Sequence, residues 1–282
     1  MPQPERLLPL LQRAAAAFRA APDRLGHVVQ LTDAADVCVA GDMHGNLDNF
    51  ARLLQVADLN QYPRRHLIVQ EVIHGKFRYP DGSDKSHQLL DLLAALKCQF
   101  PARVHFLPGN HELAQWGNRR IGKGDENQNE EFRRGVAFAY KEHAAAVYDG
   151  YMELIAAAPL VVRTPNRVYL SHSLPGRQHL EAFDPAVLQR DEFRPEDLSL
   201  GGSVHSLVWG KLATDEHVAA FLAKVDADWL ITGHVPQETG FAVPNSRQLI
   251  LDAQASPACY CLFPCDRPVS HADLIAGVGT LN

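Results

Sequence analysis

The 282-residue sequence predicts one α/β domain, residues 1–282, whose strands form a mixed sheet or two sheets packed face to face. Short apolar segments alternate along the chain with stretches whose apolar residues recur at helical spacing. Residues 159–171, PLVVRTPNRVYLS, instead predict an antiparallel hairpin with Pro165 and Asn166 at its turn. No internal repeat, low-complexity tract or long linker divides the sequence, and its length is near the upper limit for a single core.

Five predicted strands each run directly into a loop that carries polar residues, which is how an α/β scaffold displays a site. These strands are 37–40, 66–69, 104–107, 168–170 and 229–232, and they precede GDMHGN, QEVIHG, PGNHE, SHSLPG and GHVPQ. The helices predicted from apolar spacing are 47–56, 86–96, 132–146 and 217–225. Residues 249–263 predict a closing pair of strands.

Two further segments predict an amino-terminal helix and a surface loop. The apolar spacing in residues 1–25 predicts an amino-terminal amphipathic helix. Gln12, Arg13 and Arg19 interrupt the apolar run that a signal peptide requires, so we expect no signal peptide there. Residues 116–131, WGNRRIGKGDENQNEE, are polar and contain glycine, so we expect a surface loop over the site.

Composition and charge exclude several classes of partner. With 46% apolar residues and a net charge of −6, the chain is an ordinary globular protein without a broad basic surface for nucleic acid or an anionic membrane. No segment has the roughly 20 apolar residues that cross a bilayer. Five cysteines without a CxxC pair are expected to be reduced thiols, which favours a cytoplasmic location. The oligomeric state is left open.

The polar loops contain the donors of a two-metal hydrolytic site. Two hard divalent cations held close together need carboxylate, imidazole and amide oxygen ligands, with one bridging carboxylate and open positions for water and phosphate. Asp42 and His44 lie two residues apart between Gly41 and Gly45, which allow a tight turn. The remaining candidates follow the later strands and are Asn110, His111, His172 and His234.

In the motifs around these residues, the chain resembles the phosphoprotein phosphatase branch of the calcineurin-like metallophosphoesterase superfamily. GDMHGN, PGNHE, LSHSLPG and TGHVPQ occur in the family's order across residues 41–237. The resemblance implies a four-layer α/β fold in which a β-sandwich of two mixed sheets is flanked by helices. It also implies that His111 is the general acid. It assigns the first metal to Asp42 and His44, and the second to Asn110, His172 and His234.

The family's second block, GDxxDRG, is altered in this chain. The aligned residues are QEVIHGK, so Glu71 replaces the bridging Asp, His74 replaces the Asp that orients the catalytic His, and Gly75 occupies the Arg position. A second alignment places an insertion, HGKFRYPDGS, before Asp84-Lys85-Ser86. Under that alignment Asp84 orients His111, and Lys85 supplies the phosphate charge without the bidentate fork of arginine. We expect Glu71 to bridge the metals.

Further cations are candidates for binding phosphate, because both arginines expected from the family are missing. Lys211 in VWGK matches an arginine that contacts phosphate in phage and bacterial relatives. The other candidates are Arg78, Arg119, Arg120 and Lys123.

The resulting hypothesis is a metal-dependent phosphatase that hydrolyses phosphate monoesters of a protein or a small molecule. A hydroxide activated by two metal ions attacks phosphorus, and His111 protonates the leaving oxygen. The alternatives are a dinucleoside polyphosphate or phosphodiester hydrolase and a catalytically weakened scaffold with the same fold. We expect activation by Mn²⁺, while Fe, Zn, Ni and Co also suit these ligands.

Overall fold

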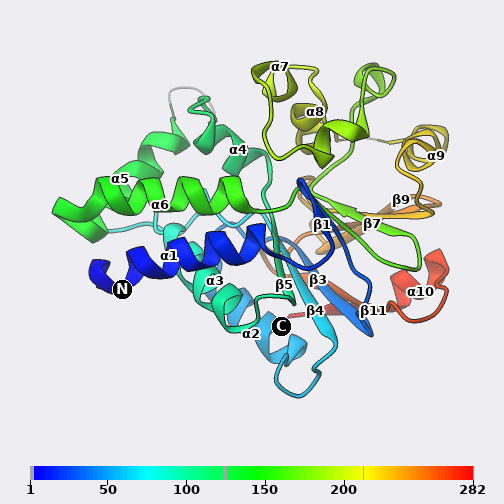
Figure 1. The fold of residues 1–282 in the computed structure, drawn as a ribbon, viewed down its shortest axis with the longest axis horizontal. Coiled ribbons are helices and arrows are strands. Elements are labelled where there is room, and N and C mark those ends of the chain that lie inside the picture. The colour runs from blue at the N-terminus through cyan, green and yellow to red at the C-terminus, as the bar shows by residue number, and fades with distance from the viewer. Residues whose placement is uncertain (1–2, 123–125, 212, 282) are drawn as a thin grey trace.

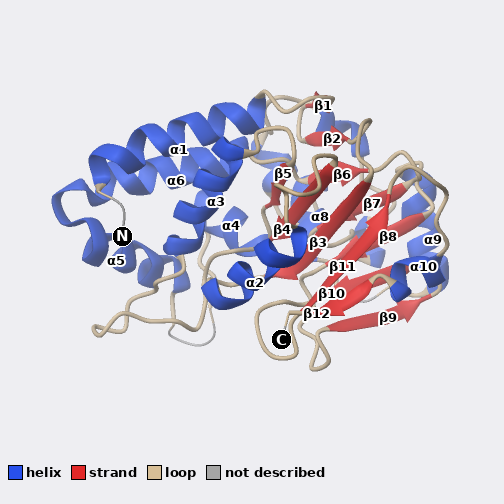
Figure 2. Cartoon of the chain, turned by 90° about the horizontal axis from the view of Figure 1, so that it is seen from below, coloured by secondary structure: helices blue, strands red, loops and turns tan. Residues whose placement is uncertain are grey.

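The computed structural model describes residues 3–122, 126–211 and 213–281, and in these ranges two β-sheets pack face to face between layers of helices (Figures 1 and 2). In Figure 1, α1, α3, α5 and α6 lie on one side of the strands, and α7, α8 and α9 lie on the other. Both sheets mix parallel and antiparallel pairs. The expected four-layer sandwich is therefore confirmed.

The first sheet positions one half of the site. In the described residues its strand order is β12 (Val278–Thr280), β11 (Cys259–Pro264), β3 (Asp36–Asp42), β4 (Arg65–Gln70) and β5 (Val104–Leu107). Strands β3, β4 and β5 are parallel, so the loops that follow them leave the sheet at the same edge. The motifs GDMHGN, QEVIHG and PGNHE lie at these strand ends, as the sequence predicts: Asp42 is the last residue of β3, Gln70 is the last residue of β4, and Pro108 follows β5.

The second sheet positions the other half. Its described order is β1 (Arg24–Leu25), β2 (Val28–Gln30), β6 (Val161–Arg163), β7 (Val168–Ser171), β8 (Trp229–Thr232), β10 (Gln248–Leu251) and β9 (Phe241–Asn245). Strands β6 and β7 form the predicted antiparallel hairpin, and β7 is parallel to β8. The loops after β7 and β8 begin with His172 and Gly233 and therefore open on the same side.

Residues 249–263 contain two strands, as predicted, but the expectation that these strands pair with each other is wrong. Strand β10 pairs in parallel with β8, whereas β11 pairs antiparallel with β3, so the two strands belong to different sheets. Apolar periodicity identifies a strand, but it does not identify the strand's hydrogen-bonding partner.

Alternation along the strands divides the apolar residues between a central core and two outer cores. Val37 and Val39 of β3 lie between the sheets, whereas Cys38 and Ala40 pack against helices, because successive side chains point to opposite faces. The helices on this outer face of the first sheet are α1 (Pro4–Arg19), α2 (Leu47–Ala57), α3 (His87–Gln99), α5 (Gln128–Tyr140) and α6 (Ala144–Ala157).

The outer face of the second sheet is covered by shorter elements. Tyr169 of β7 and Leu230 of β8 pack there against Phe221 of α9 and Leu207 of α8. The remaining helices and 3₁₀ turns are α4 (Asn110–Trp116), η1 (Lys141–His143), η2 (Arg177–His179), η3 (Pro185–Gln189), α7 (Pro195–Leu198), α8 (Ser203–Trp209), α9 (Asp215–Lys224) and α10 (His271–Ala276).

Three predicted segments differ from the structure in their bounds or continuity. In the predicted amino-terminal helix, α1 runs from Pro4 to Arg19, and residues 1–2 lie outside the described part of the chain. The single helix predicted for 132–146 is two helices, because Lys141 has a φ of 48° that a helix cannot contain. Of the loop predicted over residues 116–131, residues 117–122 and 126–127 lie between α4 and α5, whereas Trp116 ends α4 and residues 128–131 belong to α5; residues 123–125 lie outside the described part of the chain.

Candidate active site

Loops from both sheets meet at one cleft of about 620 Å³. The first sheet contributes Asp42 at the end of β3, Glu71 after β4 and Asn110 after β5, while the second contributes His234 after β8. Ile121, Gly122, Glu126 and Gln128 also line the cleft, so the described part of the loop predicted over the site borders it. The polar residues singled out in four separate motifs therefore share one space.

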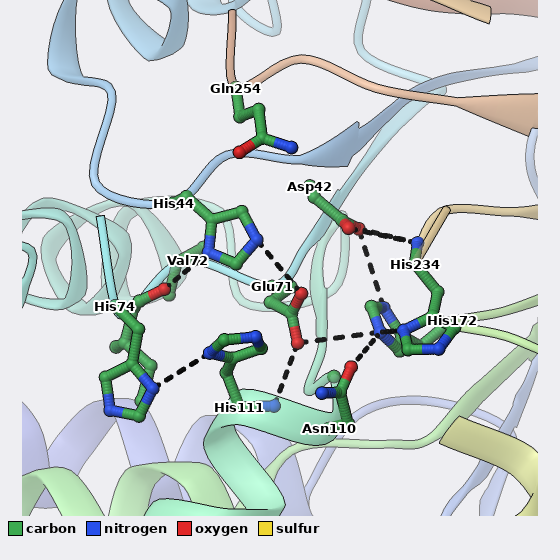
Figure 3. A network of polar contacts seen from close by, with 12 residues as sticks. Asp42, His44, Glu71, Val72, His74, Asn110, His111, His172, His234 and Gln254 are labelled. Atoms are coloured by element: carbon green, nitrogen blue, oxygen red, sulfur yellow. Dashed lines mark hydrogen bonds and ion pairs between the residues drawn. The ribbon is translucent and has the colours of Figure 1, made fainter. Parts of the chain in front are cut away.

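Glu71 lies at the centre of the site, between two groups of donors (Figure 3). Its Oε2 atom is 3.2 Å from His44 Nε2, and its Oε1 atom is 3.5 Å from His172 Nε2 on the other side. Oε1 also accepts a hydrogen bond from the backbone N–H of His111 at 2.9 Å. The carboxylate is 1% exposed. Each oxygen therefore faces a different set of ligands, which is the arrangement that a bridging carboxylate needs.

The donor atoms form two groups that share Glu71. In the described residues, one atom each from His44, Glu71 and His111 lie within 4.8 Å of one another, and so do atoms from Asp42, Glu71 and His172. Two further predicted ligands contact His172 Nε2, which lies 3.0 Å from Asn110 Oδ1 and 3.2 Å from His234 Nδ1. The structure thus brings all six expected ligands together.

The chemistry of these groups fits divalent cations. In the described part of the chain, His172 Nδ1 and His234 Nε2 are buried and have no hydrogen-bond partner. Buried polar atoms are normally satisfied, and leaving them unpaired is costly. A cation coordinated by imidazole nitrogens and carboxylate oxygens would remove that cost.

The charges of the site point the same way. Burial and the neighbouring Glu71 raise the pKa of Asp42 well above its usual value. Burial alone would raise the pKa of Glu71 too, but the imidazoles of His172, His111 and His44 hold it well below its usual value. Burial opposes the charge on His44, yet Glu71 raises its pKa to about 10. Two buried carboxylates therefore depend on nearby positive charge.

The loops adopt unusual backbone conformations at the site. His44, Glu71, His74 and His234 have φ angles of 42°, 31°, 59° and 66°, in the left-handed region that residues with a side chain rarely occupy. Each such residue costs about 1–3 kcal/mol and persists only where surrounding contacts impose it. The contacts that hold these four side chains at the cleft therefore offset the free-energy cost of their backbone conformations.

Glu112 provides some of those contacts. Its Oε1 accepts hydrogen bonds from the backbone N–H groups of Val72 and Ile73 at 2.8 and 2.9 Å, and its Oε2 accepts from Gly109 at 2.9 Å. The buried side chain thus ties the loop after β4 to the loop after β5. Glu112 was not among the predicted site residues, although it is the last residue of the quoted PGNHE motif.

Two glycines explain why the loops can approach so closely. A Cβ atom on Gly109 would lie 2.1 Å from Glu71 Oε1. A Cβ atom on Gly75 would lie 2.0 Å from the carbonyl oxygen of His44. An arginine at position 75, as in the family's second block, would therefore not fit this loop.

The structure differs from the expectation that Asp84 orients His111. His74 Nδ1 lies 2.9 Å from His111 Nδ1, whereas Asp84 accepts hydrogen bonds from Ser86 and lies 3.8 Å from Arg78. The Asp84 carboxylate therefore closes the loop that the insertion forms. Between the two alignments of the altered block, the one that leaves His74 in the position of the second Asp agrees with the contacts of His111.

Only one of the three side chains predicted to bind phosphate, Lys85, Lys211 and Arg119, lines the cleft. Lys211 lines the cleft together with Lys76, the last residue of the altered block QEVIHGK, which was not among the predicted phosphate-binding residues. Lys85 instead places its Nζ atom 5.3 Å from the ring centroid of Tyr79, and Arg119 lines an adjoining cavity. Among the described residues bordering the cleft, neither Lys85 nor Arg119 is present.

Arg78 and Arg120, two of the other candidates for binding phosphate, also lie apart from the cleft. Arg78 pairs with Glu131 and Asp84, and Arg120 lines the same adjoining cavity as Arg119. Lys123 lies outside the described residues.

Within the described ranges, none of the helices combines the length and apolar content needed to cross a membrane.

Comparisons with known proteins identify related phosphatases. A probable serine/threonine-protein phosphatase of Encephalitozoon cuniculi is 24% identical over 241 residues, which cover 79% of this chain and 48% of that protein. A serine/threonine-protein phosphatase 7 long form homolog of Arabidopsis thaliana is 29% identical over 141 residues, which cover 50% of this chain and 9% of that protein. The chain thus spans half or less of the length of these curated relatives.

Solved structures show the same fold. A Saccharomyces cerevisiae protein serine/threonine phosphatase with similarity to human phosphatase PP5 matches with a TM-score of 0.69 and 14% identity, over 97% of this chain and 86% of that one. A cold-active protein-tyrosine phosphatase of a Shewanella species matches with a TM-score of 0.60 and 12% identity, over 94% and 84%. A family model of the calcineurin-like phosphoesterases matches residues 35–238. Because this match covers well over half of the sequence and all five motifs, the chain belongs to the calcineurin-like phosphoesterase family.

Proposed function

We propose that this chain is a metal-dependent phosphatase that hydrolyses phosphate monoesters at a site for two divalent cations. The observation that carries the proposal is the position of Glu71, whose two oxygens face two separate groups of donors. Its relatives include a probable serine/threonine-protein phosphatase, which supports a phosphorylated protein or a small phosphate ester as the substrate.

Each side of Glu71 has residues to hold one cation. His44 lies on one side, and Asn110, His172 and His234 lie on the other (Figure 3). Asp42 is near both groups, because its Oδ1 lies 3.6 Å from His172 Nδ1 and its charge raises the pKa of His44. When bound, such cations act as Lewis acids on phosphate oxygens and lower the pKa of bound water toward ~7. Mn²⁺ is the cation we expect to give the highest activity, since carboxylate, amide and imidazole donors suit it.

Lys76 and Lys211 complete the proposed phosphate site. Both side chains are exposed and line the cleft that contains the metal ligands. Their positive charges would stabilise the nonbridging phosphate oxygens as negative charge develops there. A lysine attracts phosphate as a point charge without the two parallel hydrogen bonds of arginine, so binding should tolerate varied substrate orientations.

A second candidate function is the hydrolysis of dinucleoside polyphosphates. A cavity of about 450 Å³ adjoins the metal cleft, and Trp209 lines both. Trp116 and Phe193 give this cavity aromatic walls, and Arg119 and Arg120 give it positive charge. Such a cavity suits a nucleobase that stacks on an aromatic ring and a phosphate chain that pairs with arginine.

A substrate panel tests these functions. The purified chain is stripped of metal, supplied with Mn²⁺, and assayed with p-nitrophenyl phosphate, bis-p-nitrophenyl phosphate, a phosphoserine peptide and diadenosine tetraphosphate. We expect Mn²⁺-dependent turnover that is fastest on a monoester and that Asp42→Asn abolishes. Preference for diadenosine tetraphosphate would replace the first function with the second. Full metal loading without turnover of any substrate would contradict both and leave the non-catalytic scaffold.

A further inference from the structure

Three further cavities, here the flanking cavities, adjoin the metal cleft around Trp209 and Lys211. Trp209 lines the cleft and two neighbouring cavities of about 450 and 540 Å³. Lys211 lines the cleft, the second of these cavities and a third of about 360 Å³. Small-molecule sites in proteins span roughly 300–1,000 Å³. The cleft and its neighbours together are larger, so they have room for a ligand that extends beyond an ester at the metal site.

The flanking cavities carry positive charge without acidic residues. The whole sequence has 33 acidic residues and 27 lysines and arginines, yet none of the described residues that line the flanking cavities is Asp or Glu. Their lysines and arginines are Arg119, Arg120, Arg177 and Lys211. The next cavity, which shares Trp116 with the first, includes Asp191 and Glu192 in its lining. The excess of positive charge therefore belongs to the spaces beside the cleft.

Three of these cations are available to a ligand. Arg119, Arg177 and Lys211 are exposed, and within the described ranges none of them forms an ion pair. By contrast, Arg190 pairs with Asp197 at 3.2 Å. A guanidinium group can bind a carboxylate through two parallel hydrogen bonds. Arg119 and Arg177, in different flanking cavities, therefore present two sites for carboxylates.

The segments that carry Arg177 and Lys211 are fixed to each other. A Cβ atom on Gly210 would lie 1.8 Å from the carbonyl oxygen of Leu174, so the end of α8 packs tightly against the loop after β7. The Ser173 hydroxyl donates a hydrogen bond to the Gly210 carbonyl. Because this loop starts at the metal site, these contacts hold the two cations in a fixed position relative to the metal ligands.

Apolar surface accompanies the charges on both sides of Trp209. The Trp209 ring is 38% exposed, and its centroid lies 6.3 Å from that of His234. Leu200, which is 82% exposed, lines the cavity on one side, and Phe193 lines the cavity on the other. An extended peptide has side chains about 3.3 Å apart that point alternately to opposite sides. Residues before and after a phosphorylated residue can therefore reach separate cavities.

We propose that the substrate is a phosphorylated segment of a protein in which acidic residues flank the phosphorylated residue. The phosphate occupies the metal cleft, a carboxylate on one side pairs with Arg177, and a carboxylate on the other side pairs with Arg119. Arginine clusters recognise acidic and phosphorylated motifs in other peptide-binding proteins. The inference rests on the proposed phosphatase function for the reaction and adds the class of substrate. A dinucleoside polyphosphate extends from the cleft in one direction and would leave the cations on the other side of Trp209 unused.

Three phosphoserine peptides of equal length test the proposal, with aspartate, alanine or lysine at two positions on each side of the phosphoserine. The Mn²⁺-loaded wild type is assayed with each peptide and with p-nitrophenyl phosphate, which has no flanking residues. An exposed ion pair contributes a factor of about 2 to 5. Two such pairs should raise kcat/KM for the aspartate peptide roughly 4- to 25-fold above that for the alanine peptide. Equal kcat/KM for the three peptides would overturn the proposal.

Substitution of the two arginines tests where the preference arises. Arg177→Ala and Arg119→Ala should each lower the ratio of kcat/KM between the aspartate and alanine peptides by about 2- to 5-fold. Arg177→Glu should lower it further and raise kcat/KM for the lysine peptide. Arg13→Ala is the control, because Arg13 is exposed on α1, which lies on the other side of the strands from α8 (Figure 1). An aspartate preference that persists when both arginines are alanine would contradict the proposal.

The remaining outcomes separate the possible failures. If p-nitrophenyl phosphate is hydrolysed but the peptides do not differ, the flanking assignment fails alone. If no ester is hydrolysed, the proposed function fails, and fluorescence anisotropy of labelled peptides decides the flanking assignment. That assignment then predicts tighter binding of the aspartate peptide, which is lost when both arginines are alanine. An effect of Arg177→Ala that is confined to diadenosine tetraphosphate would assign the cation to the second candidate function and overturn the proposal.

Discussion

Replacement of Gly109 by alanine should weaken the site without removing any ligand. A Cβ atom there would lie 2.1 Å from Glu71 Oε1 and 2.6 Å from its Cδ, whereas ordinary contacts begin at 3.4 Å. The carboxylate, or the loop that carries it, must therefore move by about 1.3 Å. Gly109 has φ −94° and ψ −168°, which alanine also adopts, so backbone strain does not contribute.

The size of the effect follows from this displacement. A movement of that size would take Glu71 Oε1 from 2.9 Å to beyond hydrogen-bonding distance of the His111 N–H, and would change its 3.5 Å approach to His172. Crowding of this kind costs about 1–3 kcal/mol. Since ~1.4 kcal/mol corresponds to a factor of ten, the affinity for the bridged cations should fall roughly 10- to 100-fold.

Calorimetric titration with Mn²⁺ measures this loss, and a second substitution tests its cause. Glu71→Asp shortens the side chain by one methylene and makes room for the added methyl group. The double variant should therefore bind metal more tightly than the sum of the two single effects predicts. Wild-type affinity in Gly109→Ala, or strictly additive losses in the double variant, would refute the placement of Glu71 against Gly109.

The remaining predictions concern phosphate binding, metal linkage and pH. Lys211→Ala should raise KM for a monoester roughly 10-fold, as expected for a lost charged hydrogen bond, while Lys85→Ala leaves it unchanged; an unchanged KM in Lys211→Ala, or an equal rise in Lys85→Ala, in steady-state assays would contradict this assignment of the phosphate-binding lysine. Chelation should lower the free energy of unfolding by ~2.7 kcal/mol for each cation whose free concentration had been 100 times its Kd, and by less in Asp42→Asn; equal shifts in thermal melts would contradict binding at Asp42. Burial raises the pKa of Asp84 to about 6, so the folded state retains a proton that the unfolded chain has lost. The free energy of unfolding should therefore fall by up to about 3 kcal/mol between pH ~4 and ~6, and urea titrations of Asp84→Asn should lack this decrease; an unchanged slope would show that Asp84 is not its source.

The arrangement around the site could be predicted because each strand that leads into it has a local signal, whereas β1, β2, β9 and β12 were not predicted. The apolar segment before Asp42, like those before Asn110 and His172, is a strand followed by a motif, and the structure places these motifs at adjacent strand ends. Pairing carries no comparable local signal, which is why β10 and β11 were expected to pair with each other. The break at Lys141 was missed because the apolar spacing continues through it.

The candidate ligands could also be predicted, but their partners could not. His74 and Asp84 both lie in a polar loop before α3, and either could accept a hydrogen bond from His111. The choice depends on the path of that loop, in which Asp84 binds Ser86 and Arg78 while the backbone N–H of His74 contacts the Ser86 hydroxyl. Those contacts join residues up to 12 positions apart. Sequence spacing alone does not determine them.

The same reasoning applies to the cations. Lys76 lies within the insertion and Lys85 lies two residues after it, so both are near the position of the missing arginine. The turn at Gly75 leaves Lys76 beside the cleft, whereas Lys85 lies over Tyr79. A prediction from sequence would need the conformation of the whole insertion to choose between them.

The most direct test of a two-cation site bridged by Glu71 is a crystal structure with Mn²⁺, analysed by anomalous diffraction. The account predicts two anomalous peaks on opposite sides of the Glu71 carboxylate, one within coordination distance of Oε2 and His44, the other of Oε1 and His172. A single peak, or two peaks of which neither contacts Glu71, in crystals of an active preparation would contradict it.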